Sequence, residues 1–256
     1  MNEIEKYYNK FNEDKRLNTR HGQVEFFVTM QYIQKYIANR TNLDILEIGA
    51  GTGKYSIALS EMGHKVSAVE LVKQNLVRLK EKNSLVKARQ GNALDLSYYK
   101  NNSFDITLLL GPMYHLFTNE DKVKALSEAI RVTKPNGYVF VAYVMNDYAV
   151  ICHGFKDKNI IESIKNNKID NNFHIKTTVE DLYSYVRTED IENINSIAKA
   201  NRVEIIGVDG LTDYIRPFIN NLSEEEFEVY KQYILSISSR QDLIGASSHT
   251  LDILRK

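Results

Sequence analysis

The sequence predicts an α/β fold in which a mostly parallel sheet is covered by helices on both faces. Short apolar runs alternate with amphipathic segments along residues 41–146, which is typical of strand–helix–strand crossovers. The run FDITLLLG at residues 104–111 is apolar on both of its faces, as expected for a strand buried between two helical layers. A cluster of glycines after the first apolar run allows a tight turn into a helix. Together these observations indicate a doubly wound sheet.

Each predicted element follows from local periodicity and from stop signals. Apolar side chains recur near a period of 3.6 in residues 1–40, which predicts a helical segment ahead of the sheet. Gly63 ends one helix, Thr118 with Asp121 opens another, and KPNG at residues 134–137 is expected to end that second helix with a turn. The predicted strands are 43–49, 65–72, 85–90, 104–111, 137–145, 203–208 and 249–256, and the predicted helices are 54–64, 74–83, 119–132, 189–200 and one opened by Ser223 with Glu226.

The regular alternation breaks after Met145. Residues 147–183 are polar and rich in Lys, Asn and Asp, so we expect an excursion from the sheet there. Neither an internal repeat nor a low-complexity linker is present, which favours one domain over residues 1–256. Its expected parts are a helical cover at 1–40, a core at 41–146, and lid-like insertions at 147–183 and 209–247.

Composition excludes several classes of protein. The 33 basic residues balance the 33 acidic ones, so no broad field draws the chain to nucleic acid. Cys152 is the single cysteine and cannot form an intrachain disulfide, and no His/Cys spacing suggests a metal site. The N-terminus has no apolar targeting core, and the longest apolar stretch, at residues 106–110, is too short to span a bilayer. We therefore expect a cytoplasmic protein with no metal and no nucleic-acid or membrane partner.

The first strand-to-helix turn, LEIGAGTGKYS, carries the strongest chemical signal. Gly49, Gly51 and Gly53 let the backbone turn sharply and approach a ligand, although such a turn can also serve geometry alone. A dinucleotide fingerprint would need a glycine where Lys54 stands, so a pyrophosphate cradle fits poorly. Glu70 lies at the C-terminal end of the second predicted strand, 21 residues after Gly49, where a carboxylate can accept hydrogen bonds from two ribose hydroxyls. The pattern indicates a nucleoside ligand.

These residues resemble the class I S-adenosylmethionine-dependent methyltransferase family. The E-x-G-x-G-x-G of residues 47–53 is similar to the family's first motif, and Glu70 is similar to its ribose-binding acid. Residues 91–96, GNALDL, resemble the segment near adenine, with Asn92 where the family usually has Asp. The resemblance implies a Rossmann-like sheet of seven strands with an antiparallel last strand, and S-adenosylmethionine as cofactor with S-adenosylhomocysteine as product.

The resemblance also implies a binding role for particular residues. The glycine loop would pack against the methionine part of the cofactor and the ribose, and the helix after it would favour the carboxylate. Tyr8 and Arg20 could reach that carboxylate, unless the N-terminal segment is a solvated arm. The implied cofactor-binding set is Tyr8, Arg20, Glu47, Gly49, Ala50, Gly51, Gly53, Glu70, Leu71, Asn92, Ala93, Leu94 and Leu110, with Leu71, Ala93 and Leu94 beside adenine and Leu110 below the sulfonium.

The segment GPMYHL, at residues 111–116, is where the acceptor is expected. Family members that methylate adenine or amides resemble one another in an Asn-Pro-Pro-aromatic tetrad, but this chain has Gly111 in place of Asn. Oxygen, carbon, sulfur and amine acceptors therefore stay open. His115 is the candidate general base and Tyr114 a second catalytic candidate, the alternative for each being orientation or packing. His249 begins the last strand and could face the site or simply bond the backbone.

The sequence as a whole favours transfer of a methyl group from S-adenosylmethionine to a small-molecule acceptor by in-line displacement. Tyrosines at 143, 148, 183, 185 and 214 would suit an aromatic acceptor pocket or ordinary core packing. The alternatives are a protein or RNA methyltransferase, an NAD(P)-dependent oxidoreductase, and a protein that binds the cofactor without catalysis. The sequence does not set the oligomeric state.

Overall fold

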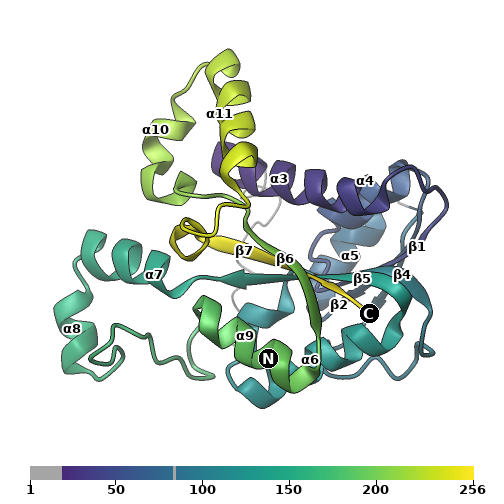
Figure 1. The fold of residues 1–256 in the computed structure, drawn as a ribbon, viewed down its shortest axis with the longest axis horizontal. Coiled ribbons are helices and arrows are strands. Elements are labelled where there is room, and N and C mark those ends of the chain that lie inside the picture. The colour runs from purple at the N-terminus through teal and green to yellow at the C-terminus, as the bar shows by residue number, and fades with distance from the viewer. Residues whose placement is uncertain (1–18, 83–84) are drawn as a thin grey trace.

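The computed structural model describes residues 19–82 and 85–256. Within them lies a seven-stranded sheet of order β3-β2-β1-β4-β5-β7-β6 (Figure 1). The pairs from β3 to β5 are parallel, whereas β7 is antiparallel to both β5 and β6, as predicted. The strands are β1 Asp44–Ile48, β2 Lys65–Glu70, β3 Lys87–Gln90, β4 Phe104–Leu109, β5 Thr133–Val144, β6 Asn201–Gly207 and β7 His249–Arg255.

Helices bury both faces of the sheet, which explains why its strands are apolar on both sides. The helices of the sheet region are α3 Arg20–Ile37, α4 Lys54–Glu61, α5 Lys73–Glu81, α6 Asn119–Val132, α9 Thr188–Ala198 and α11 Glu224–Ile237. In β1, Ile45 belongs to the cluster formed with α3, α4 and α11, while Leu46 belongs to the cluster formed with α6 and α9. Figure 1 shows these two groups of helices on opposite sides of the strands.

The helix starts predicted from local chemistry are confirmed. The Thr118 side chain accepts a hydrogen bond from the Asp121 backbone N–H at the start of α6. At the start of α11, Ser223 and Glu226 form a reciprocal capping box. The first helix, α3, begins at Arg20 behind the cap Thr19, and the expected helix over the preceding 18 residues lies outside the described part of the chain.

The expected turn at residues 134–137 is wrong in one respect. Strand β5 already begins at Thr133, and KPNG forms a bulge inside it. Pairing with β4 shifts there from Phe104 opposite Thr133 to Ile106 opposite Tyr138. Asn136, at φ 64°, takes the left-handed conformation that the bulge requires.

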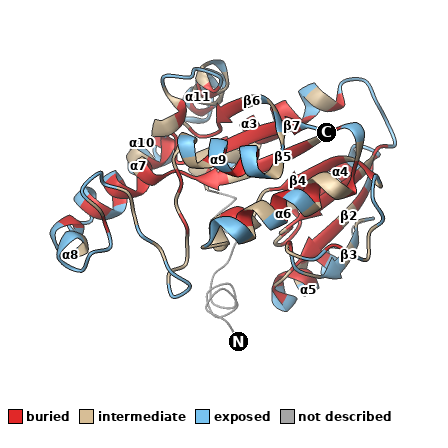
Figure 2. Cartoon of the chain, turned by 60° about the horizontal axis from the view of Figure 1, so that its bottom comes forward, coloured by how far each residue is buried: buried red, intermediate tan, exposed pale blue. Residues whose placement is uncertain are grey.

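The excursion after β5 carries more structure than its polar composition suggested. It consists of α7 Asn146–Ala149, a π-helical turn η2 Val150–Lys156 and α8 Ile160–Lys165. Val150, Ile160 and Ile169 form a small apolar cluster of their own inside it. Figure 2 shows α8 at the far end of this projecting segment, mostly exposed. A second insertion, with η3 Thr212–Ile215, α10 Arg216–Asn220 and α11, stands beside the same end of the sheet (Figure 1).

None of the helices in residues 19–82 and 85–256 combines the length and the apolar character that crossing a bilayer requires.

Candidate active site

A cavity of about 290 Å³ opens at the edge of the sheet where β1, β2 and β4 end. Parallel sheets place ligands at this edge because several strand ends and helix starts converge there. The antiparallel β7 begins at the same edge, so its first residues also reach the cavity. Among the residues predicted from the sequence, those that line it are Glu47, Gly49, Ala50, Gly51, Glu70, Leu71, Asn92, Ala93, Leu94, Leu110, Tyr114 and His115.

The glycine turn and Glu70 are joined directly. One carboxylate oxygen of Glu70 accepts from the Gly51 backbone N–H at 2.7 Å, and the other accepts from the Val72 N–H at 2.8 Å. Gly49 and Ala50 also donate backbone hydrogen bonds to the Val69 carbonyl. Glu70 is only 5% exposed, so its carboxylate is buried directly beneath the glycine turn. This arrangement leaves a backbone cradle with one buried carboxylate.

Glu47 is a second carboxyl group in the cavity wall, and its environment differs. Its side chain accepts a hydrogen bond from the Ser56 hydroxyl, and the residue is 2% exposed. Burial raises the pKa of Glu47 to about 8, and the charge of Glu70 adds to the rise, while the Ser56 hydrogen bonds oppose it. Glu47 is therefore mostly a neutral acid at pH 7.

Asn75 was missed by the sequence analysis. It lies on α5, lines the cavity and is 2% exposed, and its Oδ1 atom has no hydrogen-bond partner among the described residues. A buried amide oxygen without a partner costs free energy unless a ligand or water satisfies it. The sequence could have indicated that Asn75 is buried, because it stands four residues before Leu79 and therefore on the same, apolar face of the predicted helix.

Leu71, Ala93 and Leu94 are apolar residues that line the cavity. Asn92 precedes two of them and accepts a hydrogen bond from the Leu94 N–H at 3.0 Å through Oδ1. That bond fixes the turn that presents Ala93 and Leu94 to the cavity.

Tyr114 and His115 also line the cavity, and they lie on the short 3₁₀ turn η1 Pro112–His115 that follows β4. His115 Nδ1 lies 2.9 Å from the Leu182 carbonyl oxygen, so Nδ1 must carry the proton that it donates. Tyr183 stacks against the imidazole with ring centroids 5.4 Å apart. Burial lowers the pKa of His115 to about 4, although the bond to Leu182 opposes the shift. The ring is thus neutral at pH 7 and a weak base.

The tyrosines at 143, 148, 183, 185 and 214 do not line the cavity, and most of them pack in apolar clusters, which was the alternative prediction. Tyr143 is fully buried in the sheet core. A separate cluster surrounds Val144, Tyr148 and Cys152, where the large aromatic side chains fill space between β5 and the insertions. Its partly buried members include Tyr114, Tyr185 and Tyr214.

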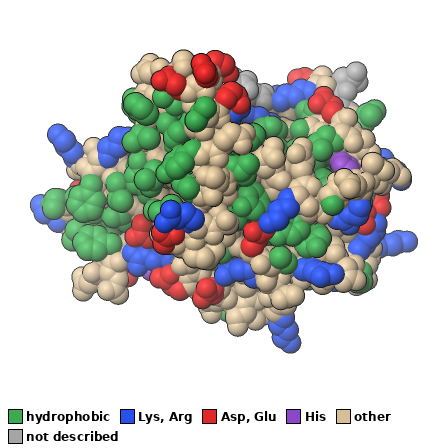
Figure 3. Space-filling model, turned by 45° about the horizontal axis from the view of Figure 1, so that its top comes forward, with side chains coloured by type: hydrophobic (Ala, Val, Ile, Leu, Met, Phe, Trp, Pro, Cys, Tyr) green, Lys and Arg blue, Asp and Glu red, His purple; other side chains and the backbone are tan. Residues whose placement is uncertain are grey.

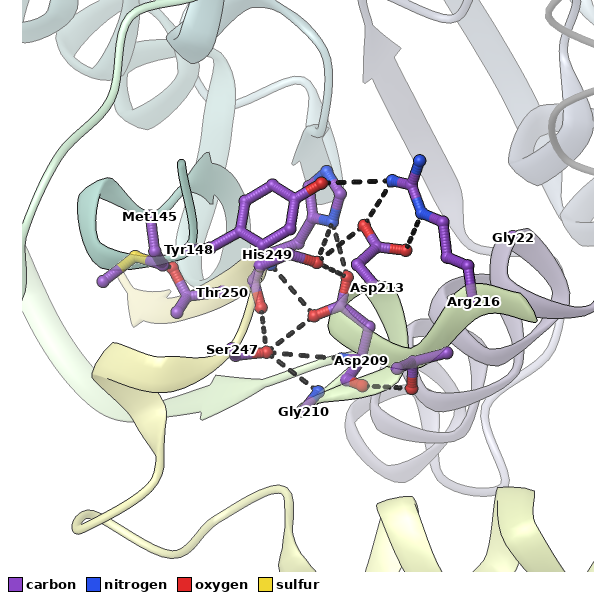
Figure 4. Close-up of polar contacts among 12 residues, drawn as sticks. Gly22, Met145, Tyr148, Asp209, Gly210, Asp213, Arg216, Ser247, His249 and Thr250 are labelled. Atoms are coloured by element: carbon purple, nitrogen blue, oxygen red, sulfur yellow. Dashed lines mark hydrogen bonds and ion pairs between the residues drawn. The ribbon is translucent and has the colours of Figure 1, made fainter. Parts of the chain in front are cut away.

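A buried polar network at the start of β7 was not predicted (Figure 4). His249 Nδ1 lies 2.6 Å from an Asp209 carboxylate oxygen. Arg216 donates two hydrogen bonds of 2.8 Å to Asp213, and Ser248 donates to both carboxylates. Burial by itself would lower the pKa of His249, but the nearby carboxylates outweigh it and raise the pKa to about 9. Two features of the sequence could have revealed this network. Asp209 directly follows the predicted strand 203–208, and His249 begins the last predicted strand, which was expected to be antiparallel.

Two of the predicted cofactor residues that the structure describes, Arg20 and Gly53, do not line the cavity. The Arg20 guanidinium donates to the Leu222 and Ser223 carbonyls and pairs with Glu224 at 3.3 Å, because its side chain turns toward α11. Gly53 is absent from the wall of the cavity among the described residues and instead makes room for Leu79. Tyr8 lies outside the described residues. Arg20 therefore links α3 to the start of α11, and Gly53 allows α5 to pack closely against the glycine turn.

Comparison with known proteins supports the same family. The family described as "Methyltransferase domain" matches residues 46–141. A glycine/sarcosine N-methyltransferase from Aphanothece halophytica is 29% identical over 140 residues, which cover 53% of this chain and 50% of the relative. A cypemycin N-terminal methyltransferase from Streptomyces sp. is 32% identical over 100 residues, covering 38% of this chain and 40% of the relative. These matches span half or less of the curated relatives.

The fold is shared over nearly the whole chain with solved structures. An S-adenosylmethionine-dependent methyltransferase from Thermotoga maritima superposes with a TM-score of 0.59 and 19% identity, covering 99% of this chain and 97% of that one. Together, the domain match at residues 46–141, the curated relatives and the shared fold show that this chain resembles the class I S-adenosylmethionine-dependent methyltransferases. S-adenosylmethionine is the cofactor of that family.

Proposed function

We propose that the protein transfers a methyl group from S-adenosylmethionine to a small-molecule acceptor. The observation that carries the proposal is the joining of the glycine turn to the buried Glu70 in the wall of one cavity. Bound S-adenosylmethionine supplies an electrophilic methyl group on a sulfonium, and transfer leaves a neutral thioether. The protein's task is then to align the reactants and exclude water.

The cofactor end of the cavity offers groups suited to a nucleoside. Glu70 accepts backbone hydrogen bonds from Gly51 and Val72 in the cavity wall, and a carboxylate is a suitable acceptor for ribose hydroxyls. Asn75 Oδ1 lacks a partner among the described residues and would accept a further hydroxyl or amino hydrogen. Leu71, Ala93 and Leu94 give the cavity apolar surface against which an adenine ring can pack. These properties support a cofactor-binding role for Glu70, Leu71, Asn75, Ala93 and Leu94. The other proposed cofactor residues are Glu47, Gly49, Ala50, Gly51, Asn92 and Leu110.

The acceptor end is proposed to lie beyond Leu110. Tyr114 and His115 face the cavity there, and the neutral His115 can accept a hydrogen bond through Nε2. Its low pKa makes it better suited to orient an acceptor than to remove a strongly held proton. The insertions at residues 147–183 and 209–247 would cover this end within one domain over residues 1–256.

A small molecule is favoured over a macromolecular acceptor. The formal charge is balanced, and on the face in Figure 3 basic and acidic side chains are intermixed. One curated relative is named for methylation of glycine and sarcosine, which are small molecules. Protein or RNA methylation is the second candidate, and the cytoplasmic location stays a prediction.

Ligand-dependent thermal stability tests the cofactor assignment. S-adenosylmethionine and S-adenosylhomocysteine should both raise Tm, because a ligand that binds only the folded state adds about 2.7 kcal/mol at a hundred times its Kd. NADH should not. Glu70→Ala and Asn75→Ala should reduce the shift, whereas Glu61→Ala, at the exposed end of α4, should keep it. Stabilisation by NADH alone would overturn the proposal.

The acceptor class can be found with a labelled methyl group. A metabolite extract and a separate protein and RNA fraction would each be incubated with the protein and isotopically labelled S-adenosylmethionine. Label in the small-molecule fraction supports the proposal. Label confined to protein or RNA would replace it with the second candidate.

A further inference from the structure

A buried lysine links the turn that carries His115 to the end of the first insertion. Lys122 lies on α6 and is 3% exposed. Its ammonium group donates one hydrogen bond to the Leu116 carbonyl oxygen and another, at 2.9 Å, to the Ser184 hydroxyl. Leu116 directly follows η1, whereas Ser184 lies 62 residues from Lys122 in sequence. Lys122 therefore bridges two parts of the chain that only the fold brings together.

The residues next to Ser184 hold the imidazole ring of His115. Leu182 accepts the hydrogen bond from His115 Nδ1 at 2.9 Å, and the Tyr183 ring lies against the imidazole. The Ser184 backbone N–H donates to the Tyr114 carbonyl at 2.7 Å. We call residues 182–184 the 182–184 segment. The position of this segment against η1 sets both the proton position and the orientation of the His115 ring.

The chain on either side of the 182–184 segment is held in different ways. After it, the Val186 N–H donates to the Val144 carbonyl, and the Asn146 N–H donates to the Val186 carbonyl, so the chain runs beside the end of β5. Before it, the Asp181 N–H donates to the Thr178 carbonyl in a local, exposed turn. Lys122 thus adds a side-chain tie to α6 at the point where the chain leaves β5 and approaches His115.

The burial of Lys122 is costly, which argues that its two hydrogen bonds matter. Among residues 19–82 and 85–256, no carboxylate forms a salt bridge with it, although Asp190 and Asp121 act on it at longer range. Burial outweighs these two charges and lowers the pKa of Lys122 to about 8. A buried ammonium group costs free energy that an apolar side chain of similar volume would not. Both hydrogen bonds that offset this cost end next to η1 or on the 182–184 segment.

We propose that Lys122 is a positioning residue, which through Ser184 holds the 182–184 segment against η1 and so fixes the tautomer and orientation of His115 in the cavity wall. Its relevance to catalysis rests on the proposed methyl transfer, in which His115 orients the acceptor. With the proton held at Nδ1 by Leu182, the lone pair of the ring is on Nε2. Release of the segment would let the ring turn and let the proton move between the two nitrogens.

The tautomer of His115 can be measured without knowing the acceptor. Nitrogen NMR of histidine-labelled protein, assigned with His115→Gln, distinguishes a ring protonated at Nδ1 from one protonated at Nε2. We expect the Nδ1–H form in the wild-type protein at pH 7. In Lys122→Met and in Ser184→Ala, the shifts of the two ring nitrogens should move toward each other, because the tautomers then mix. A His115 spectrum that is unchanged in both variants would overturn the proposal.

Two further variants separate positioning from a general loss of stability. Lys124→Met changes an exposed lysine of the same helix and should leave the His115 spectrum as in the wild type. Ser184→Thr keeps the hydroxyl that accepts from Lys122 and should restore the Nδ1–H form that Ser184→Ala loses. If Lys122→Met does not fold, the comparison of Ser184→Ala with Ser184→Thr still decides. A lowered Tm with a wild-type His115 spectrum would show a merely structural role and refute the proposal.

Kinetics with the acceptor found by methyl labelling give the second readout. In Ser184→Ala and Lys122→Met we expect kcat to fall by about 10-fold or more, since a displaced positioning group misaligns the acceptor. The KM for S-adenosylmethionine should stay as in the wild type, because Glu70 and the glycine turn are untouched. An unchanged kcat, or a rise in that KM with no change in kcat, would contradict the role of Lys122. Absence of any stabilisation of the wild-type protein by S-adenosylmethionine would instead count against the proposed function, while the His115 spectra would still test the positioning role.

Discussion

A Cβ atom on Gly111 would lie 2.8 Å from the carbonyl oxygen of Gly49. The turn after β4 therefore touches the glycine turn after β1 backbone to backbone, and the two turns together form the floor of the cavity. The contact also explains why a side chain as large as Asn has no room at position 111 in this chain. Any side chain there must push the two turns apart.

Gly111→Ala should therefore weaken both folding and cofactor binding. We expect a loss of about 1–3 kcal/mol in the free energy of unfolding, because backbone atoms must move. The Tm shift caused by S-adenosylhomocysteine should also shrink. Gly245→Ala is the control, since a Cβ there meets no atom within 4 Å. Equal behaviour of the two variants in chemical denaturation would contradict this view of the contact.

Gly53→Ala should destabilise the protein more than Gly51→Ala. Both glycines have positive φ, at 87° and 55°, which costs an alanine about 1 kcal/mol. At Gly53 a Cβ would also come within 2.0 Å of the Leu79 side chain, which is fully buried and cannot swing into solvent. A Cβ atom added at Gly51 would meet no other atom within 4 Å, apart from those of its chain neighbours. Urea denaturation should rank them in this order, and the reverse order would refute the packing role.

Glu47→Gln should stabilise the empty protein at high pH. The pKa of Glu47 is raised to about 8 in the folded protein, so its contribution to stability is complete below about pH 4.5 and is lost as the pH rises through 8. Glutamine does not ionise and avoids this loss, which is on the order of 2–4 kcal/mol. Denaturation at pH 5 and pH 8.5 should show a gain for the variant only at pH 8.5. Glu61→Gln, at the exposed end of α4, should show none at either pH.

His115→Gln should make the protein less sensitive to acid. The pKa of His115 falls to about 4 on folding, so its contribution is present above about pH 6.5 and is lost as the pH falls through 4. Glutamine can still donate a hydrogen bond to the Leu182 carbonyl without titrating. Between pH 7 and pH 4 the wild type should lose about 2 kcal/mol more than the variant. His153→Gln, at an exposed site, is the control, and parallel acid curves for all three proteins would contradict the prediction.

The sequence by itself determined the strand–helix alternation and most residues of the cavity wall that we propose for the cofactor. Apolar runs, the glycine turn and the capping box of Ser223 with Glu226 each involve only a few consecutive residues, so neighbouring residues determine their geometry. Glu70 was also recoverable, because the length of one strand–helix–strand unit fixes its distance from the glycine turn. The same reasoning failed at residues 134–137, where pairing with β4 extends β5 through the expected turn.

Only the tertiary structure decided the surroundings of the two histidines that line the cavity, His115 and His249. Asp209 and His249 are 40 residues apart, and they meet because antiparallel β7 begins at the edge where β6 ends. Arg20 lies 204 residues from Glu224, and the packing of α3 against α11 turns it away from the cavity. The proton affinities of His115 and His249 diverge for the same reason, since burial and the charges of distant segments set them. Local chemistry places a residue on a strand or turn, but its electrostatic environment depends on which other segments fold against it.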